Sequence, residues 1–172
     1  MRVVTTSHTV VDSPLGPLTL RAEDGILSGL FMTAHRHGPA ADMLGVRDEN
    51  GLPAVREQLA AYFAGSLRVF DLPLALRGTE FQQRVWAALR EIPYGATTPY
   101  GELAAAIGRP AAVRAVGLAN GRNPVSIVVP CHRVVGAGGA LTGYGGGVER
   151  KRALLDLERG VAAGAAGLVP ST

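Results

Sequence analysis

The residues around position 131 are of types that can carry out chemistry. Cys131 is the only cysteine among the 172 residues, and His132 and Arg133 follow it directly. A neighbouring cation stabilises the thiolate, which is the nucleophilic form of cysteine. A lone cysteine between valine pairs is also typical of a small buried hydrophobe. A nucleophile and a structural core residue therefore both remain open for Cys131.

A carboxylate near the C-terminal end of the chain is the second candidate. Leu154 and Glu158 are four residues apart and share one face of a predicted helix over 148–159. Negative charge is unfavourable in the last turn of a helix. A buried partner would explain the glutamate, and His132 is the obvious one, because an acid that orients an imidazole beside a nucleophile is the logic of a catalytic triad. The alternative is a solvated terminal glutamate.

The segment before Cys131 predicts short helices. Thr79 and Gln82 form a capping-box pattern at the start of a helix that ends before Pro93. Thr98 is an expected N-cap for a helix over 99–107, and a second helix follows over 111–121, so the pair is a helix-turn-helix candidate. Residues 126–129 are expected to form a buried strand that ends at Pro130.

Small residues dominate the second helix of this pair. Ala115 and Gly117 accompany Arg114, which is its long side chain. Such a helix can pack tightly on a neighbour, or it can approach a nucleic acid backbone closely with one arginine projecting forward. The charge distribution favours an anionic partner for this half of the chain. Residues 1–75 carry six arginines and eight acidic residues, whereas residues 76–172 carry eleven basic and six acidic residues.

The N-terminal part predicts strands over 18–22 and 26–32, joined by a tight turn at Asp24-Gly25, and a helix over 52–65. Residues 33–51 lack a period and are expected to form a mobile loop. We therefore predict an α+β protein, with a small N-terminal α/β structural domain over 1–76. A mostly helical domain over 77–160 with a winged helix-turn-helix and a flexible tail over 161–172 complete the expected arrangement.

Composition and motifs exclude several classes of protein. Hydrophobic residues make up 47% of the chain and charged residues 18%, as in soluble globular proteins. The sequence shows neither a signal-peptide run nor a membrane-length apolar stretch, so we expect a cytoplasmic protein without a membrane partner. The histidines at 8, 35 and 37 lack metal-ligand spacing, and the glycine-rich segment over 136–147 has no phosphate-loop lysine. We expect no metal and no cofactor.

Three stretches together resemble the O6-alkylguanine-DNA alkyltransferase family: "FQQRVWAALREIPYGATTPYGELA", "RAVGLANGRNPVSIVVPCHRV" and "GALTGYGGGVERKRALLDLE". The resemblance covers residues 77–159 almost continuously and residues 12–30 loosely. It implies that Cys131 is the alkyl acceptor, that His132 takes its proton through a water, and that Glu158 orients the imidazole. Tyr100 would donate a hydrogen bond to the leaving guanine.

The same resemblance implies a DNA-binding surface and a base pocket. Arg114 would enter the duplex in place of a flipped nucleotide, and the further DNA contacts would be Ala115, Gly117, Asn120 and Arg133. Tyr144, Val134 and Gly145 would line the base pocket, although many relatives carry Ser where Gly145 stands. Asn123 would act as a structural hinge that ties the recognition helix to the Cys131 turn.

The implied function is repair of double-stranded DNA that contains O6-alkylguanine, by irreversible transfer of the alkyl group to Cys131 in a single turnover. The resemblance implies a monomer and leaves open cooperative binding along DNA and activity on O4-alkylthymine. Two other functions stay open: a module that binds alkylated DNA without transferring the group, and a cysteine hydrolase that uses Cys131, His132 and Glu158.

Overall fold

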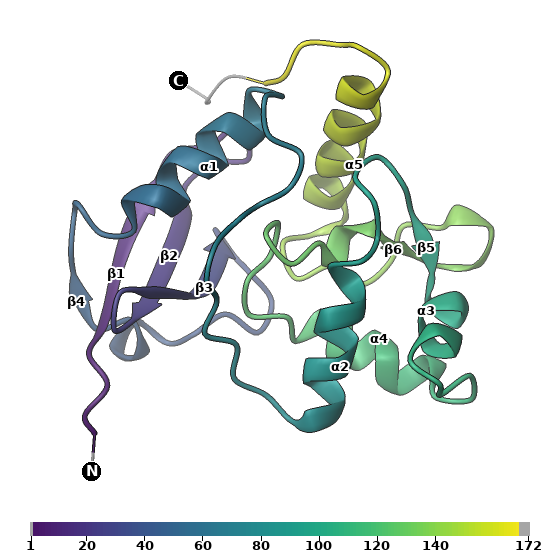
Figure 1. Ribbon diagram of the computed structural model, residues 1–172, viewed down its shortest axis with the longest axis horizontal. Helices are drawn as coiled ribbons and strands as arrows, with labels where there is room; N and C mark the ends of the chain where they lie inside the picture. The colour runs from purple at the N-terminus through teal and green to yellow at the C-terminus, as the bar shows by residue number, and fades with distance from the viewer. Residues whose placement is uncertain (1, 169–172) are drawn as a thin grey trace.

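A small sheet covered by one helix forms the N-terminal half of the protein. The computed structural model describes residues 2–168, and its four-stranded sheet has the order β3-β2-β1-β4. The strands are β1 (Thr6–Val11), β2 (Leu18–Glu23), β3 (Ile26–Met32) and β4 (Val46–Arg47). Helix α1 (Pro53–Phe63) crosses one face of this sheet (Figure 1). The predicted hairpin is confirmed, since Asp24 and Gly25 both have positive φ, as tight two-residue hairpin turns require.

Residues 33–51 are more ordered than the sequence indicated. They include the 3₁₀ turn η1 (Ala41–Met43) and strand β4, which pairs in parallel with β1. The prediction of a mobile loop throughout this segment is therefore wrong. The strand is only two residues long, which is too short to leave an alternating hydrophobic pattern in the sequence.

Four helices make up most of the C-terminal half. They are α2 (Glu80–Leu89), α3 (Tyr100–Ala106), α4 (Val113–Gly121) and α5 (Val148–Ala162). The capping box of α2 is confirmed, because the Thr79 side chain accepts from the Gln82 amide while the Gln82 side chain accepts from the Thr79 amide. The buried Trp86 indole donates to the Ala119 carbonyl at 2.9 Å and so ties α2 to α4.

Two short strands flank the helix-turn-helix formed by α3 and α4. Strand β5 (Thr98–Pro99) pairs in parallel with β6 (Val134–Val135), which follows the 3₁₀ turn η2 (Cys131–Arg133). A second 3₁₀ turn, η3 (Ala137–Gly139), comes next. The fold is therefore α+β with a winged helix-turn-helix, as predicted. No helix within residues 2–168 is long and apolar enough to cross a membrane.

Three local predictions for this half are wrong. Thr98 does not cap α3, because it belongs to strand β5 and Pro99 is the N-cap residue. Helix α4 begins at Val113, so the connection between α3 and α4 is longer than the expected turn. Residues 126–129 form consecutive turns in place of a strand, and Ile127 has a φ of 73°, which no strand residue adopts.

The last helix continues beyond the expected end at Arg159. Val161 is buried and extends the apolar stripe of Leu154 and Leu157, so packing carries α5 through Gly160. After the helix, the Leu168 amide donates to the Phe63 carbonyl of α1 at 2.5 Å. The flexible tail expected from residue 161 therefore does not begin there, and residues 169–172 lie outside the described part of the chain.

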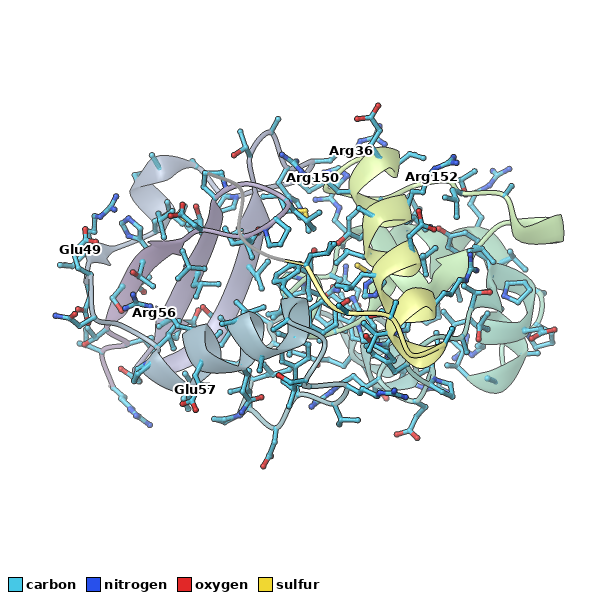
Figure 2. The ribbon with its side chains drawn as sticks, turned by 90° about the horizontal axis from the view of Figure 1, so that it is seen from above. Arg36, Glu49, Arg56, Glu57, Arg150 and Arg152 are labelled. Atoms are coloured by element: carbon cyan, nitrogen blue, oxygen red, sulfur yellow. The ribbon has the colours of Figure 1, made fainter. Side chains whose placement is uncertain are left out.

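The two halves contact each other through backbone hydrogen bonds and through hydrogen bonds that side chains donate. The Leu30 amide donates to the Pro124 carbonyl at 2.9 Å, and the Arg36 amide donates to the Gly145 carbonyl at 2.7 Å. Arg150 at the start of α5 donates to the Thr33 carbonyl at 2.6 Å. Arg36 and Arg150 accordingly lie close together in Figure 2. The segment that precedes α5 is thus fixed by hydrogen bonds to the N-terminal half.

Candidate functional site

Cys131 lies at the start of η2, directly after Pro130, and its side chain is only 4% exposed. Asn123 fixes the turn that leads to it. The Asn123 amide donates to the Val129 carbonyl at 2.8 Å, and its side-chain oxygen accepts from the Val125 amide at 3.0 Å. Asn123 lies two residues after the C-terminal end of α4, so its side chain joins that end of the helix to the cysteine turn, and a hinge role stays a prediction.

His132 and Glu158 are in contact, both fully buried. The His132 Nε2 and Glu158 Oε2 atoms are 2.8 Å apart. Burial alone would raise the pKa of Glu158, but His132 and Arg133 beside it hold that pKa at about 2. The carboxylate is therefore ionised and accepts a hydrogen bond, so Nε2 carries the hydrogen of the imidazole.

The other nitrogen of the same ring is available as a base. His132 Nδ1 is buried and has no hydrogen-bond partner in the part of the chain that the structure describes. Burial lowers the pKa of His132, Glu158 opposes this shift, and the charges of Arg133 and Lys151 add to it. A neutral imidazole with its proton on Nε2 leaves a lone pair on Nδ1, which is the form that a proton acceptor requires.

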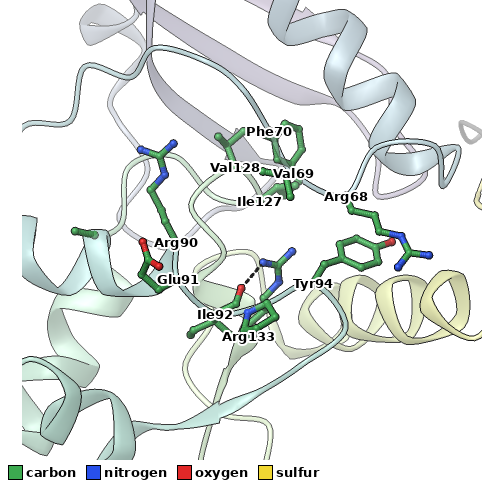
Figure 3. Close-up of a pocket in the computed structure, with 12 residues that line it drawn as sticks. Arg68, Val69, Phe70, Arg90, Glu91, Ile92, Tyr94, Ile127, Val128 and Arg133 are labelled. Atoms are coloured by element: carbon green, nitrogen blue, oxygen red, sulfur yellow. Dashed lines mark hydrogen bonds between the residues drawn. The ribbon is translucent and has the colours of Figure 1, made fainter.

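Arg133 is not placed to contact DNA, which corrects its predicted role. Its side chain is buried and binds Glu158 through two nitrogens, at 2.8 and 2.9 Å. A third nitrogen donates to the Ile92 carbonyl at 2.8 Å, and Figure 3 shows this bond beside Tyr94. The guanidinium lines a cavity of about 470 Å³ together with the segment over 68–70 and residues of and after α2, and α4 does not contribute to that lining. Arg133 therefore holds the carboxylate.

Lys151 is a charged residue of this site that the sequence analysis missed. Its side chain is fully buried, and Nζ donates to the Thr142 carbonyl at 2.7 Å. Burial lowers the pKa of Lys151 to about 8, while the nearby Cys131 thiol opposes that shift. The run "ERKR" resembles a solvated face, but Lys151 is three residues before Leu154 and seven before Glu158. That helical spacing was the signal that could have found it.

The charge of Lys151 acts on the Cys131 thiol. Burial raises the pKa of Cys131, whereas the Asn123 and Ser126 side chains and the charge of Lys151 oppose this shift. The resting protein therefore holds a protonated thiol. A proton acceptor must act before the sulfur becomes nucleophilic, and the unpaired Nδ1 of His132 is the base available nearby.

Of the residues predicted for the base pocket, Tyr144 and Val134 are buried and Gly145 is half-buried, and their contact with a substrate base stays a prediction. Tyr144 is buried and its hydroxyl has no partner among residues 2–168, while the Tyr100 hydroxyl donates to the Thr142 carbonyl at 3.4 Å. Val134 is fully buried in β6. A Cβ atom on Gly145 would lie 2.6 Å from His35 Nε2, so a side chain at this position would require the imidazole to shift.

Helix α4 presents only some of the residues predicted to contact DNA. Arg114 and Ala115 are exposed near its start, and a Cβ atom on Gly117 would touch the Tyr100 ring at 3.9 Å. Asn120 is 2% exposed, and its amide donates to the Cys131 carbonyl at 3.4 Å. The prediction of a surface DNA contact at Asn120 is therefore wrong, because this side chain links α4 to the cysteine turn.

The fold and this site define a class of protein, namely an α+β protein with a winged helix-turn-helix and a buried cysteine beside a histidine–glutamate pair. Two family models match the chain, which therefore belongs to the 6-O-methylguanine DNA methyltransferase family. The model of the 6-O-methylguanine DNA methyltransferase ribonuclease-like domain matches residues 7–76, and that of the DNA binding domain matches residues 80–160.

Individual proteins are similar over most of their length. The methylated-DNA--protein-cysteine methyltransferase of Mycobacterium tuberculosis is 55% identical over 152 residues, which cover 88% of this chain and 92% of that protein. The protein of the same name from Methanosarcina acetivorans is 51% identical over 152 residues, covering 88% and 97%. A crystal structure of Mycobacterium tuberculosis OGT in complex with DNA has a TM-score of 0.85 and 54% identity, covering 90% of this chain and 94% of that one.

Proposed function

We propose that this protein repairs DNA by moving an alkyl group from the O6 atom of guanine to the Sγ atom of Cys131. The observation that carries the proposal is the buried chain of contacts from Glu158 to His132, which leaves Nδ1 unpaired beside the cysteine turn. The family and the similarity to a protein solved with DNA support the same substrate class.

The proposed chemistry uses this chain's own side chains throughout. His132 Nδ1 takes the thiol proton through a water, and Glu158 and Lys151 stabilise the resulting imidazolium and thiolate. The sulfur attacks the alkyl carbon, the bond from that carbon to O6 breaks, and its electron pair stays on guanine. Tyr100 donates a hydrogen bond to the departing base. The thioether product has no labile bond, so each molecule acts once and needs no cofactor.

The substrate base must leave the duplex to reach a thiol that is 4% exposed. We propose that α4 enters the groove, where small residues such as Ala115 allow close approach and Arg114 fills the space of the extruded nucleotide. Tyr144, Val134 and Gly145 would then receive the base. We also propose that the protein acts as a monomer. The proposal also includes a cytoplasmic location, because the substrate is DNA and the relatives above come from organisms without a nucleus.

Intact-mass measurement after incubation with an O6-methylguanine duplex tests this function. We expect the protein to gain the mass of one methyl group, with a stoichiometry of one and no further turnover. Binding of the duplex without any gain in mass would instead indicate a module that only recognises alkylated DNA. Continued release of product from an ester or peptide would indicate a hydrolase. Parallel duplexes with O4-methylthymine or with several lesions report substrate range and cooperativity.

Replacement of Arg114 by alanine is expected to slow repair of duplex DNA by about 10- to 100-fold, because extrusion of a base costs a few kcal/mol that the arginine offsets. Reaction with free O6-benzylguanine, which needs no extrusion, should change by less than about twofold. Rates of alkylation measured by mass with both substrates provide the comparison.

Arg159→Ala is the matched control for this variant. Arg159 is exposed near the C-terminal end of α5, and Figure 1 shows that end on the opposite side of the molecule from α4. The control should repair duplex DNA at the wild-type rate. Equal losses for duplex and free base in Arg114→Ala would contradict the role in base extrusion.

A further inference from the structure

One side chain of the N-terminal half reaches the buried carboxylate of the candidate site. Tyr62 belongs to α1, is fully buried, and donates a hydrogen bond from its hydroxyl to Glu158 Oε2 at 2.6 Å. The two residues are 96 positions apart in the chain. The carboxylate that contacts His132 is therefore held partly from outside the DNA-binding half.

The hydrogen bonds on this carboxylate are unevenly distributed. Among residues 2–168, Glu158 Oε1 accepts from Arg133 alone, whereas Oε2 accepts from Tyr62, Arg133 and His132. Tyr62 and His132 therefore share one oxygen atom. Each donor that Oε2 accepts draws electron density from it, so the Tyr62 hydroxyl weakens the hold of Oε2 on the Nε2 proton.

The ring of Tyr62 is fixed by its neighbours and not only by this bond. It contacts Phe63, Phe70 and Tyr94, with ring centroids 5.2, 5.3 and 6.3 Å apart respectively. Replacement of the hydroxyl by hydrogen leaves this aromatic packing in place. The hydroxyl and the packing of Tyr62 can therefore be separated by experiment.

We propose that Tyr62 is a positioning residue for the alkyl transfer, which sets the pH at which His132 becomes free to accept the thiol proton. The proposal rests on the proposed function of His132 as the base. Without the Tyr62 hydroxyl, the carboxylate would carry more negative charge on Oε2 and would bind the imidazolium form more tightly. His132 would then stay protonated to a higher pH and could not act as a base there.

The other ionisable groups around this pair stay in place in the experiment. Those that interact with His132 or Glu158 come from several elements packed on them, namely Tyr62, Tyr94, Arg133, Tyr144 and Lys151. The two cations nearest the imidazole are Arg133 and Lys151, and both favour its neutral form. Tyr62 is a neutral donor to the same carboxylate oxygen that His132 contacts. Removal of the Tyr62 hydroxyl therefore favours the protonated form of His132.

The test is the rate of reaction of the full chain with O6-benzylguanine between about pH 5 and about pH 9. In Tyr62→Phe we expect the acid limb of the profile to move up by about one pH unit, which makes the reaction about tenfold slower on that limb. The rate should return to the wild-type value at high pH, and affinity for duplex DNA should not change. A purely structural role would lower the rate equally at every pH.

Tyr94→Phe is the matched control, because the Tyr94 hydroxyl is buried without a hydrogen-bond partner in residues 2–168 and its ring touches the same aromatic cluster. Its profile should match the wild type. A second variant, with 3-fluorotyrosine at position 62, keeps the packing and donates more strongly, so its acid limb should move to lower pH. This variant also covers the case in which Tyr62→Phe does not fold.

A Tyr62→Phe profile that coincides with the wild type, or one that falls uniformly, overturns the inference, as does an unshifted profile for the 3-fluorotyrosine variant. The proposed function fails separately. It fails when the wild-type protein gains no alkyl mass, or when His132→Ala retains the full rate and the acid limb. The two failures can be told apart. If the wild-type protein transfers the alkyl group and needs His132, but the Tyr62 variants have unaltered pH profiles, then only the role of Tyr62 is wrong.

Discussion

Replacement of Cys131 by alanine is expected to abolish alkyl transfer completely. Cys131 is the only cysteine of the chain, so no second thiol can take over the reaction. The variant should still bind an O6-methylguanine duplex with nearly the wild-type affinity, because Arg114 and Ala115 of α4 are untouched. Intact mass after incubation with the duplex, together with a binding titration, measures both properties.

Cys131→Ser is the companion to this experiment. It keeps a polar group of similar shape at the same place, but a serine hydroxyl is far less acidic than a thiol, so we expect no detectable transfer. Repair by either variant at a measurable rate would mean that another side chain accepts the alkyl group. Loss of duplex binding in both variants would mean that the cysteine turn also supports the orientation of α4.

Replacement of Glu158 by glutamine should be the most destabilising of the isosteric changes at this site. The change leaves Arg133 buried without its carboxylate, and removal of one partner from a buried ion pair costs about 3–5 kcal/mol. Denaturant unfolding at neutral pH measures the loss. Glu149→Gln, an exposed position in the first turn of the same helix, should change stability by less than about 1 kcal/mol.

The pH dependence of the free energy of unfolding provides a second test of the role of Glu158. The pKa of Glu158 is about 2 in the folded protein, below its ordinary value of 4.5. Its contribution to stability is therefore present above about pH 4.5 and is lost as the pH falls towards 2. Burial lowers the pKa of His132 from 6.5, so its neutral form also favours the folded state at higher pH. The Glu158→Gln variant should lack the steep loss between pH 4.5 and 2 that the wild type shows, and an unchanged acid limb would contradict the assignment.

Local patterns predicted those parts of the protein whose causes are local. The capping box at Thr79 and the turn at Asp24-Gly25 depend on residues within a few positions of each other, and both are confirmed. The contact between His132 and Glu158 was one of the two alternatives that the sequence left open for this glutamate, and the structure shows the contact. The family resemblance supplied the function, which such patterns alone left open.

The errors about the residues of the site have a common physical origin in contacts between separate segments of the chain. Arg133 and Asn120 appear suited to DNA by residue type, yet each is buried against a group that the sequence does not place nearby. Lys151 stands in a charged run and is buried all the same. Tyr62 was not predicted to belong to the site, because its partner Glu158 lies in the other half of the chain. Burial of polar groups is decided by tertiary packing, which residue type does not reveal.

The burial of Cys131 also affects how long the thiol stays unoxidised before the protein encounters alkylated DNA. Oxidants attack exposed thiolates first, and sulfinic and sulfonic acids are not reduced back to a thiol by ordinary means. The Cys131 side chain is 4% exposed and burial raises its pKa, so the resting protein offers a protonated sulfur that solvent hardly reaches. A side chain that can be used only once is thereby preserved from loss by oxidation.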